Sequence, residues 1–282
     1  MLIFNTQNEL VSHLNFVSNA TTTIGLVPTM GALHLGHLSL LLEALQHNTL
    51  VVVSIFVNPT QFNNPEDLAK YPRTLEQDLE KIKTISEKII VFAPSVNDIY
   101  EGKTMAQHFD FDGLENQMEG KFRPGHFEGV GTIVKRLFEI VQPTNAYFGE
   151  KDFQQLQIIK KMVQITNLSV NIISCPIFRE QNGLAMSSRN ERLTKNERNE
   201  AAIIFKTLLQ SKNLFKTRSS NRITKFVIKT FENKKNFDLE YFQIADESSL
   251  LPCVRKNKTK KYRAFIAVFV NNIRLIDTIS FN

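Results

Sequence analysis

Residues Val27 to Leu38 read Val-Pro-Thr-Met-Gly-Ala-Leu-His-Leu-Gly-His-Leu, and this stretch carries the strongest signal for the fold. The apolar run Thr23 to Val27 leads into it and predicts a buried strand, whereas Leu38 to Leu45 has the spacing of a helix. Pro28 and Gly31 lie between the strand-like and the helix-like segment and predict a turn there. The order is therefore strand, turn and helix N-terminus, and the unpaired backbone N–H groups of such a terminus attract phosphate.

Two histidines, His34 and His37, lie at this turn beside Gly36. Imidazole N–H groups there can donate hydrogen bonds to a phosphate whose negative charge grows during a reaction. The alternative interpretation is a zinc pair or two ordinary surface histidines. Because zinc needs three or four ligands and no Cys/His cluster accompanies these two, the sequence favours phosphate chemistry.

The composition is typical of a globular protein with one or two domains. At 282 residues, with 42% hydrophobic and 22% charged side chains, the chain can bury a sizeable core. No apolar run of about 18 residues predicts a membrane span, and the polar stretch Met1 to Ala20 does not resemble a secretory signal. Two cysteines, Cys175 and Cys253, are typical of a reducing compartment. We therefore expect a cytoplasmic protein with no membrane partner.

The charge is unevenly distributed along the chain. Residues 1–175 hold 13 lysines and arginines against 18 acidic residues, whereas residues 176–282 hold 21 against 10. The run Arg255, Lys256, Lys258, Lys260, Lys261 and Arg263 sharpens this contrast and raises the alternative of nucleic-acid binding. A solvated hairpin loop before the strand-like residues 264–270 is the more ordinary interpretation, and we expect no nucleic-acid partner.

Short apolar strands alternate with longer helical patterns through most of the chain. The further predicted strands are Thr49–Val57, Lys88–Phe92, Asn145–Phe148 and Leu168–Ser174. The predicted helices between them are Thr74–Glu87, Val130–Val141 and Phe153–Thr166. This order predicts an α/β fold, a doubly wound parallel sheet with helices on both faces. Ligands bind such sheets at the carboxyl ends of the strands, near the change in strand order.

A composition shift near residues 175–188 predicts a domain boundary, with domains at residues 1–177 and 178–282. Beyond the boundary we predict helices at Asn196–Gln210 and Ile223–Phe231, and strands at Leu239–Ile244, Arg263–Val270 and Ile273–Thr278. The mixed order predicts a smaller α+β domain with a three-stranded sheet.

Three further stretches follow strand-like segments or precede helices. Asn58 and Gln61 are candidate pocket residues after the second strand, although an ordinary turn would also use them. The stretch Gly149 to Asp152 combines a glycine, a lysine and a helix start, which suits phosphate. Residues 183–190 offer two hydroxyls and a guanidinium, either for triphosphate oxygens or as a polar interdomain turn.

Two other positions have open interpretations. Thr74 is the expected N-cap of its helix, and Asp78 in the first turns either complements the helix dipole or holds a magnesium ion. Arg123 and His126 lie in a Gly- and Pro-rich stretch, where they either place a cation near an anionic ligand or form a rigid helix entry.

Together these stretches closely resemble the pantothenate synthetase (pantoate–β-alanine ligase) family, within the wider nucleotidylyl-transferase superfamily. The matching motifs span nearly the whole chain in the family's order. They are Pro28 to His37, Phe56 to Phe62, Tyr71 to Thr74, Arg123 to Phe127, Phe148 to Asp152 with Gln155, Met186 to Asn190, and Arg274 to Asp277.

The resemblance implies a Rossmann-like sheet and an ATP-dependent, two-step ligation. Pantoate's carboxylate attacks the α-phosphate of ATP to give pantoyl adenylate and pyrophosphate, and β-alanine's amine then displaces AMP. Activation is needed because a carboxylate is a poor electrophile, and Mg²⁺ neutralises the triphosphate. No enzyme nucleophile is required. The resemblance also implies a homodimer formed through the first domain, with the basic second domain as a lid.

The resemblance assigns site residues by motif. The implied catalytic residues are His34, His37, Lys151, Ser187 and Arg189, with His37 matching the customary proton donor. The implied ATP-binding residues are Met30, Gly31, Ala32, Leu33, His34, Leu35, Gly36, His37, Gly149, Glu150, Lys151, Asp152, Phe178, Met186, Ser187, Ser188 and Arg189. Pantoate is assigned to Asn58, Gln61 and Gln155, and β-alanine to Gln61.

Two positions depart from the family pattern. Phe178 stands where the family usually has a valine whose backbone contacts adenine, and Gln77 stands where some members have an acidic residue before the aspartate that matches Asp78. The second departure weakens the metal assignment at Asp78. The runner-up function is another nucleotidylyl transferase that leaves AMP on its product, but Gln61 and Gln155 favour a small polyhydroxylated carboxylate instead.

If most lysines of the second domain are simply solvated, then among its cationic side chains we expect only Arg189 and Lys195 to affect ATP binding. The double variant Arg255→Ala/Lys256→Ala should then have a Michaelis constant for ATP close to that of the parent. Steady-state kinetics at varied ATP checks this, and a tenfold rise would contradict it.

Overall fold

The computed structural model describes all residues from Met1 to Asn282 and divides the chain into two compact units. The N-terminal unit comprises Met1–Glu115, Gly120–Gly149 and Gln155–Pro176. The C-terminal unit comprises Ile177–Asn282 together with two short segments, Asn116–Glu119 and Glu150–Gln154. No local sequence pattern signals these two segments, and the domain assignment at residues 1–177 and 178–282 stays a prediction.

A six-stranded parallel sheet forms the N-terminal unit, in the order β1-β4-β3-β2-β5-β6. Its strands are β1 (Leu2–Phe4), β2 (Ile24–Thr29), β3 (Leu50–Ile55), β4 (Ile90–Phe92), β5 (Asn145–Gly149) and β6 (Asn171–Cys175). The predicted parallel α/β class is confirmed, while β1 at the edge was not expected from the polar N-terminal stretch.

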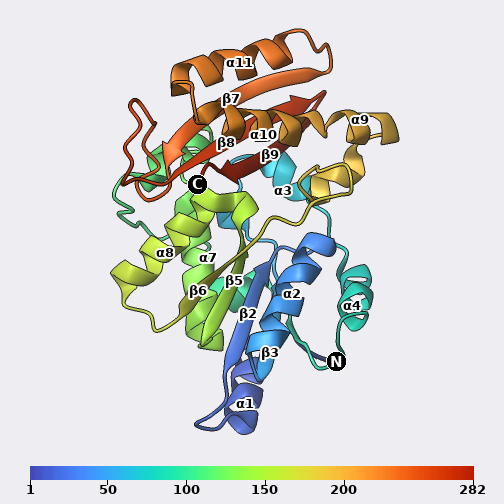
Figure 1. The fold of residues 1–282 in the computed structure, drawn as a ribbon. Coiled ribbons are helices and arrows are strands. Elements are labelled where there is room, and N and C mark those ends of the chain that lie inside the picture. Colours follow the sequence, from blue (N-terminus) through green and yellow to red (C-terminus); the bar gives the residue numbers. More distant parts are fainter. The chain divides into compact units, whose positions relative to one another are not determined.

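Helices accompany this sheet along the chain (Figure 1). They are α1 (Gln7–Val17), α2 (Leu35–His47), α3 (Pro65–Lys70), α4 (Leu75–Lys83), α5 (Val96–Tyr100), α6 (Met118–Phe122), α7 (His126–Val141) and α8 (Phe153–Thr166). Two short 3₁₀ helices are η1 (Pro59–Gln61) and η2 (Leu114–Asn116), while a third, η3 (Glu150–Asp152), follows β5 but belongs to the C-terminal unit. None of the helices combines the length and the apolar character that a membrane span requires.

The central strands are buried on both faces, which explains their β-branched sequence. Val27, Val51 and Val53 pack with apolar residues of α2 and with Ile82 of α4. The alternate residues of β2 and β3, Leu26 and Val52, are also fully buried. Because successive side chains of a strand point to opposite faces, Leu26 and Val52 lie on the other face of the sheet. On that face α7 contacts both β2 and α1.

The C-terminal unit is built on an antiparallel sheet in the order β7-β8-β9 (Figure 1). Its strands are β7 (Phe237–Asp246), β8 (Tyr262–Val270) and β9 (Ile273–Ser280), so the predicted third strand is confirmed. Its helices are α9 (Lys195–Glu200), α10 (Ile203–Phe215) and α11 (Ser220–Glu232), with the 3₁₀ helix η4 (Ser188–Arg192). Leu208, Val227 and Ile266 belong to the core that joins α10 and α11 to the sheet.

Two helix predictions differ from the structure in instructive ways. The single helix predicted at residues 196–210 is two helices, because tight turns at Ala201 and Ala202 separate α9 from α10. The helix predicted from Leu38 begins earlier, at Leu35, because His34 caps it with its side chain. Apolar periodicity locates the buried face of a helix, whereas local hydrogen bonds decide where the helix begins.

The loop after β7 depends on the carboxylate of Asp246, which accepts hydrogen bonds from both Ser248 and Ser249. Burial alone would raise the pKa of Asp246, but these bonds and the charge of Lys260 outweigh it and lower the pKa to about 2. The unfolded chain takes up this proton near pH 4 (about 3.9 for a free Asp). The stabilisation is therefore complete above that pH and is lost as the pH falls toward 2.

We accordingly expect the free energy of unfolding to fall more steeply with acid in the parent protein than in Asp246→Asn. Urea unfolding between about pH 6 and pH 2 measures both slopes. Asp238→Asn, at an exposed position of β7, is the matched control and should keep the parent slope. Equal slopes in the parent and Asp246→Asn would contradict the assignment.

Candidate active site

The two histidines of the opening motif form a reciprocal cap at the start of α2. His34 Nδ1 accepts a hydrogen bond from the backbone N–H of Gly36 at 3.1 Å. His37 Nδ1 accepts from the backbone N–H of His34 at 3.4 Å. The two rings stack with centroids 4.0 Å apart. Because both Nδ1 atoms accept, a neutral imidazole at either position carries its proton on Nε2, the nitrogen that can serve as a donor.

Asp78 of α4 shapes the turn between β2 and α2. Its carboxylate is fully buried and accepts from the backbone N–H groups of Leu33 at 2.7 Å and Ala32 at 2.9 Å. Gly31 and Ala32 both adopt positive φ, so the turn has an uncommon conformation that needs such support. Thr74 lies at the N-cap position but makes no cap bond, and its hydroxyl instead donates to Asp78.

These contacts decide the metal assignment at Asp78. Both carboxylate oxygens are directed at protein donors, and the structure holds no group of three or more His, Cys, Asp or Glu residues able to bind a metal ion. The residues present therefore do not fit a magnesium ion bound directly to Asp78. The carboxylate supports the turn instead.

Asn58 and Gln61 follow β3 and are joined by hydrogen bonds. Asn58 is almost fully buried, and its Nδ2 donates to Gln61 Oε1 and to the backbone oxygen of Gly129, both at 3.1 Å. Its Oδ1 accepts from Tyr100 and caps η1 through Thr60. Both ends of the Asn58 amide are therefore engaged within the protein, and one of its partners is the side chain of Gln61.

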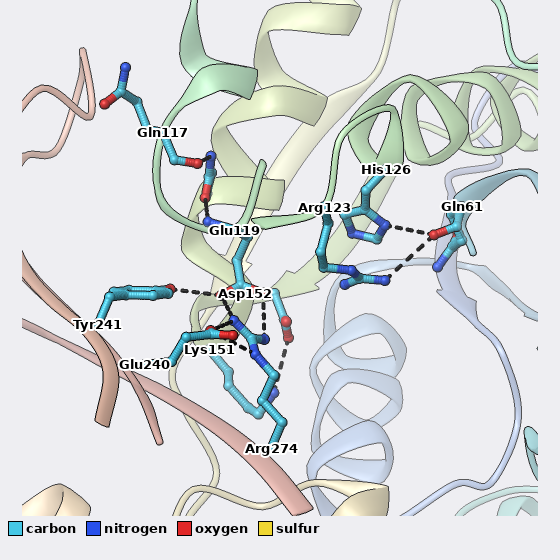
Figure 2. Close-up of polar contacts among 11 residues, drawn as sticks. Gln61, Gln117, Glu119, Arg123, His126, Lys151, Asp152, Glu240, Tyr241 and Arg274 are labelled. Atoms are coloured by element: carbon cyan, nitrogen blue, oxygen red, sulfur yellow. Dashed lines mark hydrogen bonds and ion pairs between the residues drawn. The ribbon is translucent and has the colours of Figure 1, made fainter. Parts of the chain in front are cut away.

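Gln61 links two loops of the N-terminal unit. Its Nε2 donates to the sulfur of Met30, in the loop after β2, at 3.1 Å. Its backbone oxygen accepts from His126 Nδ1 at 2.9 Å and lies 3.5 Å from a guanidinium nitrogen of Arg123 (Figure 2). Arg123 and His126 at the entry to α7 therefore contact the loop after β3, and both predicted roles of these two residues stay predictions.

Sheet topology places the candidate residues of the N-terminal unit at one edge. Strands β3, β2 and β5 are neighbours and parallel, so their carboxyl ends share that edge. The strand order changes direction at β2 and β5, which is where open α/β sheets bind ligands. Residues Met30 to His37 follow β2, Asn58 and Gln61 follow β3, and Gly149 ends β5. Gln155 lies in the first turn of α8.

The remaining candidates belong to the C-terminal unit. Glu150, Lys151 and Asp152 form η3. Phe178 accepts the backbone hydrogen bond of Met186 at 3.0 Å, which brings these two predicted residues together in a short hairpin. Ser187 caps η4, its hydroxyl accepting from the backbone N–H of Arg189 at 3.2 Å. Ser188 begins η4.

One residue of the basic run differs from the expectation. Arg263 closes the basic run and also begins a predicted strand, and it does lie in a strand, β8; what differs is its burial, because it is only 4% exposed. It forms ion pairs with Glu150 and Glu247, both at 3.0 Å. The sequence placed Arg263 at the start of a strand but gave no sign of its burial, because its neighbours 255–261 are exposed.

An open parallel sheet whose switch point carries a capped helix N-terminus and paired imidazoles defines an α/β protein of the nucleotide-binding class. A family model described as Pantoate-beta-alanine ligase matches residues 2–280. The chain belongs to the pantoate–β-alanine ligase family, and it is a carbon–nitrogen ligase.

Curated relatives and solved structures agree with this assignment. The chain is 66% identical to pantothenate synthetase of Flavobacterium psychrophilum, with 99% of each chain covered. It is 52% identical to the enzyme of Christiangramia forsetii over the whole of both chains. The crystal structure of pantothenate synthetase from Thermus thermophilus matches with a TM-score of 0.90 at 36% identity, covering 100% of this chain and 99% of that one.

A further solved structure carries ligands. Pantoate-beta-alanine ligase from Francisella tularensis, described as complexed with beta-gamma ATP and beta-alanine, matches with a TM-score of 0.80 at 35% identity. The match covers 100% of this chain and 98% of that one.

The role of Asp78 in the turn gives a direct test. Asp78→Asn keeps one acceptor but turns an N–H₂ group toward a backbone donor, so we expect a loss of about 1–3 kcal/mol in the free energy of unfolding. Urea unfolding measures it. Glu76→Gln, an exposed residue in the same turn of α4, is the control and should change stability little. Equal stability of the two variants would contradict the role.

Proposed function

We propose that the chain joins (R)-pantoate and β-alanine to form pantothenate in two steps, through a pantoyl-adenylate intermediate. The first step releases pyrophosphate and the second releases AMP. Membership of the ligase family over nearly the full chain supports the overall reaction, and the ligands described for the Francisella enzyme support ATP and β-alanine as substrates. The capped N-terminus of α2 at the switch point is the observation that carries the adenylation step.

Adenylation builds negative charge at the α-phosphate of ATP. The N-terminus of α2 favours an anion through its backbone N–H groups and dipole, and the two histidines supply donors at Nε2. We assign ATP binding in the N-terminal unit to residues Met30 to His37 and Gly149. His37, which matches the family's customary proton donor, is proposed to direct its Nε2–H at the α-phosphate, and His34 stabilises the same charge.

Pantoate is a small acid with two hydroxyls, so amide side chains suit it. We assign Gln61 and Gln155 to pantoate, with Asn58 acting through its hydrogen bond to Gln61. Gln61 also borders the proposed β-alanine site.

The C-terminal unit supplies the other proposed ATP contacts. These are Glu150, Lys151 and Asp152 of η3, and Phe178, Met186, Ser187, Ser188 and Arg189 of the hairpin and η4. Lysine and arginine there would neutralise phosphate oxygens. Mg²⁺ is proposed to enter with ATP as part of the substrate rather than at a resident site.

The remaining expectations stay proposals. They are a homodimer formed through the first domain, a cytoplasmic location and the absence of a nucleic-acid partner.

The products of the reaction distinguish this ligase from the alternative, a nucleotidylyl transferase that leaves AMP on its product. Incubation with ATP and pantoate alone should support exchange of labelled pyrophosphate into ATP, and addition of β-alanine should release AMP. Failure of both would overturn the proposal.

Substituting His37 tests the adenylation step directly. His37→Ala should lower turnover by roughly two to four orders of magnitude, the scale of losing a transition-state donor. The melting temperature should change little because the cap bond to His34 is long. Gln155→Ala is the comparison and should mainly raise the Michaelis constant for pantoate. An active His37→Ala enzyme would remove this histidine from the mechanism.

A further inference from the structure

The segment Glu150–Gln154 follows β5 of the N-terminal unit in sequence but belongs to the C-terminal unit. It contains Lys151, to which the proposed function assigns a contact with the ATP phosphates. Two sets of contacts hold this segment within the C-terminal unit, one at each end. Arg263 of β8 makes the first set, and the other short segment, Asn116–Glu119, makes the second.

The first set centres on Arg263 of β8. Its guanidinium forms an ion pair with Glu150 at 3.0 Å and another, through Nε, with Glu247 at 3.0 Å. The guanidinium carbon also lies 3.9 Å from the centroid of the Phe153 ring. Glu150 and Phe153 are the residues directly before and after the pair Lys151-Asp152. One buried arginine therefore holds both flanks of this pair.

Only arginine can make this set of contacts. A guanidinium is a planar fork with five donors, so it can bind two carboxylates and stack on an aromatic ring at once. A lysine ammonium keeps the charge but has no plane to stack. Removing the charge altogether would leave Glu150 and Glu247 without their common partner, and the side chain of Glu247 is only 18% exposed.

The second set holds the other end of the segment, at Gln154. Gln154 Oε1 accepts from the backbone N–H of Glu119 at 2.9 Å, and its Nε2 donates to the backbone oxygen of Gln117 at 2.7 Å. The carboxylate of Glu119 pairs with Arg274 through two bonds of 2.8 Å and accepts from the Tyr241 hydroxyl (Figure 2). This set explains why both short segments cluster with the sheet β7-β8-β9.

Lys151 lies between these two sets. Its side chain is 17% exposed, and its Nζ lies 3.4 Å from the Asp152 carboxylate. A lysine has four rotatable bonds, and its backbone position limits where the ammonium can reach. The contacts of Glu150 and Phe153 with Arg263 fix that backbone position.

We propose that Arg263 is a positioning residue for the ligation: by holding Glu150 and Phe153 it fixes η3 so that Lys151 is directed at the nucleotide phosphates. This rests on the proposed function, in which Lys151 contacts ATP. Arg263 itself touches no substrate in this proposal and acts only through η3.

A double-mutant cycle between Arg263 and Lys151 tests the proposal. Steady-state kinetics at varied ATP should show a fall of about 10- to 100-fold in kcat/KM for Arg263→Met, the scale of a small misplacement of a catalytic group. Lys151→Ala should lower the same constant. The double variant should be no worse than Lys151→Ala alone, because Arg263 acts through Lys151. Arg263→Lys should lie between the parent and Arg263→Met.

Two controls accompany the cycle. Arg255→Met removes an exposed arginine from the same basic stretch and should keep the parent kinetics. Circular dichroism and thermal melting establish that each variant is folded. If Arg263→Met does not fold, Phe153→Leu replaces it in the cycle, because it removes the ring against which the Arg263 guanidinium lies while the ion pair with Glu247 remains.

The outcomes distinguish the positioning role of Arg263 from the ATP contact of Lys151. Fold-changes that multiply in the double variant, or a parent-like Arg263→Met, would overturn the positioning role while Lys151 keeps its own. A Lys151→Ala enzyme with parent kinetics would instead overturn the assignment of Lys151 to ATP, and the positioning role with it. A double variant equal to Lys151→Ala supports both.

Discussion

The buried carboxylate of Asp78 is the contact on which the candidate site depends most. It accepts the backbone N–H groups of Ala32 and Leu33, two donors that a tight turn at positive φ would otherwise leave unpaired. Leaving such donors unsatisfied costs free energy comparable to a lost hydrogen bond. With the turn fixed, His34 can cap α2, and the N-terminus of that helix faces the edge where β2 and β5 end.

Other candidate residues are held in the same way, by buried polar groups on neighbouring elements. Asn58 binds Gln61, His126 binds the backbone of Gln61, and Arg263 binds both flanks of the pair Lys151-Asp152. Burying a polar or charged group is costly unless its partners are in place, so each contact favours one loop conformation over others. The site residues therefore lie in short loops whose shape is set by residues distant in sequence.

Prediction from sequence succeeded where one physical signal dominates. The β-branched run of β3 and the apolar spacing of α8 predicted their elements well, since burial on both faces or along one stripe fixes the residue types. It was least accurate at element ends. Thr74 has the chemistry of an N-cap but bonds to Asp78, and Arg263 sits among exposed lysines but is buried. Such choices depend on partners that no local pattern reveals.

The sequence by itself determined the parallel α/β class, the three-stranded second sheet and the histidine motif at a helix start, because periodicity and turn residues are local properties. Only the tertiary structure decided that Asp78 supports the turn rather than a metal ion. Only it revealed that residues 116–119 and 150–154 belong with the C-terminal sheet. The reason is that hydrogen bonds and ion pairs between distant residues, such as Glu119 with Arg274, form only when folding brings them within about 3 Å.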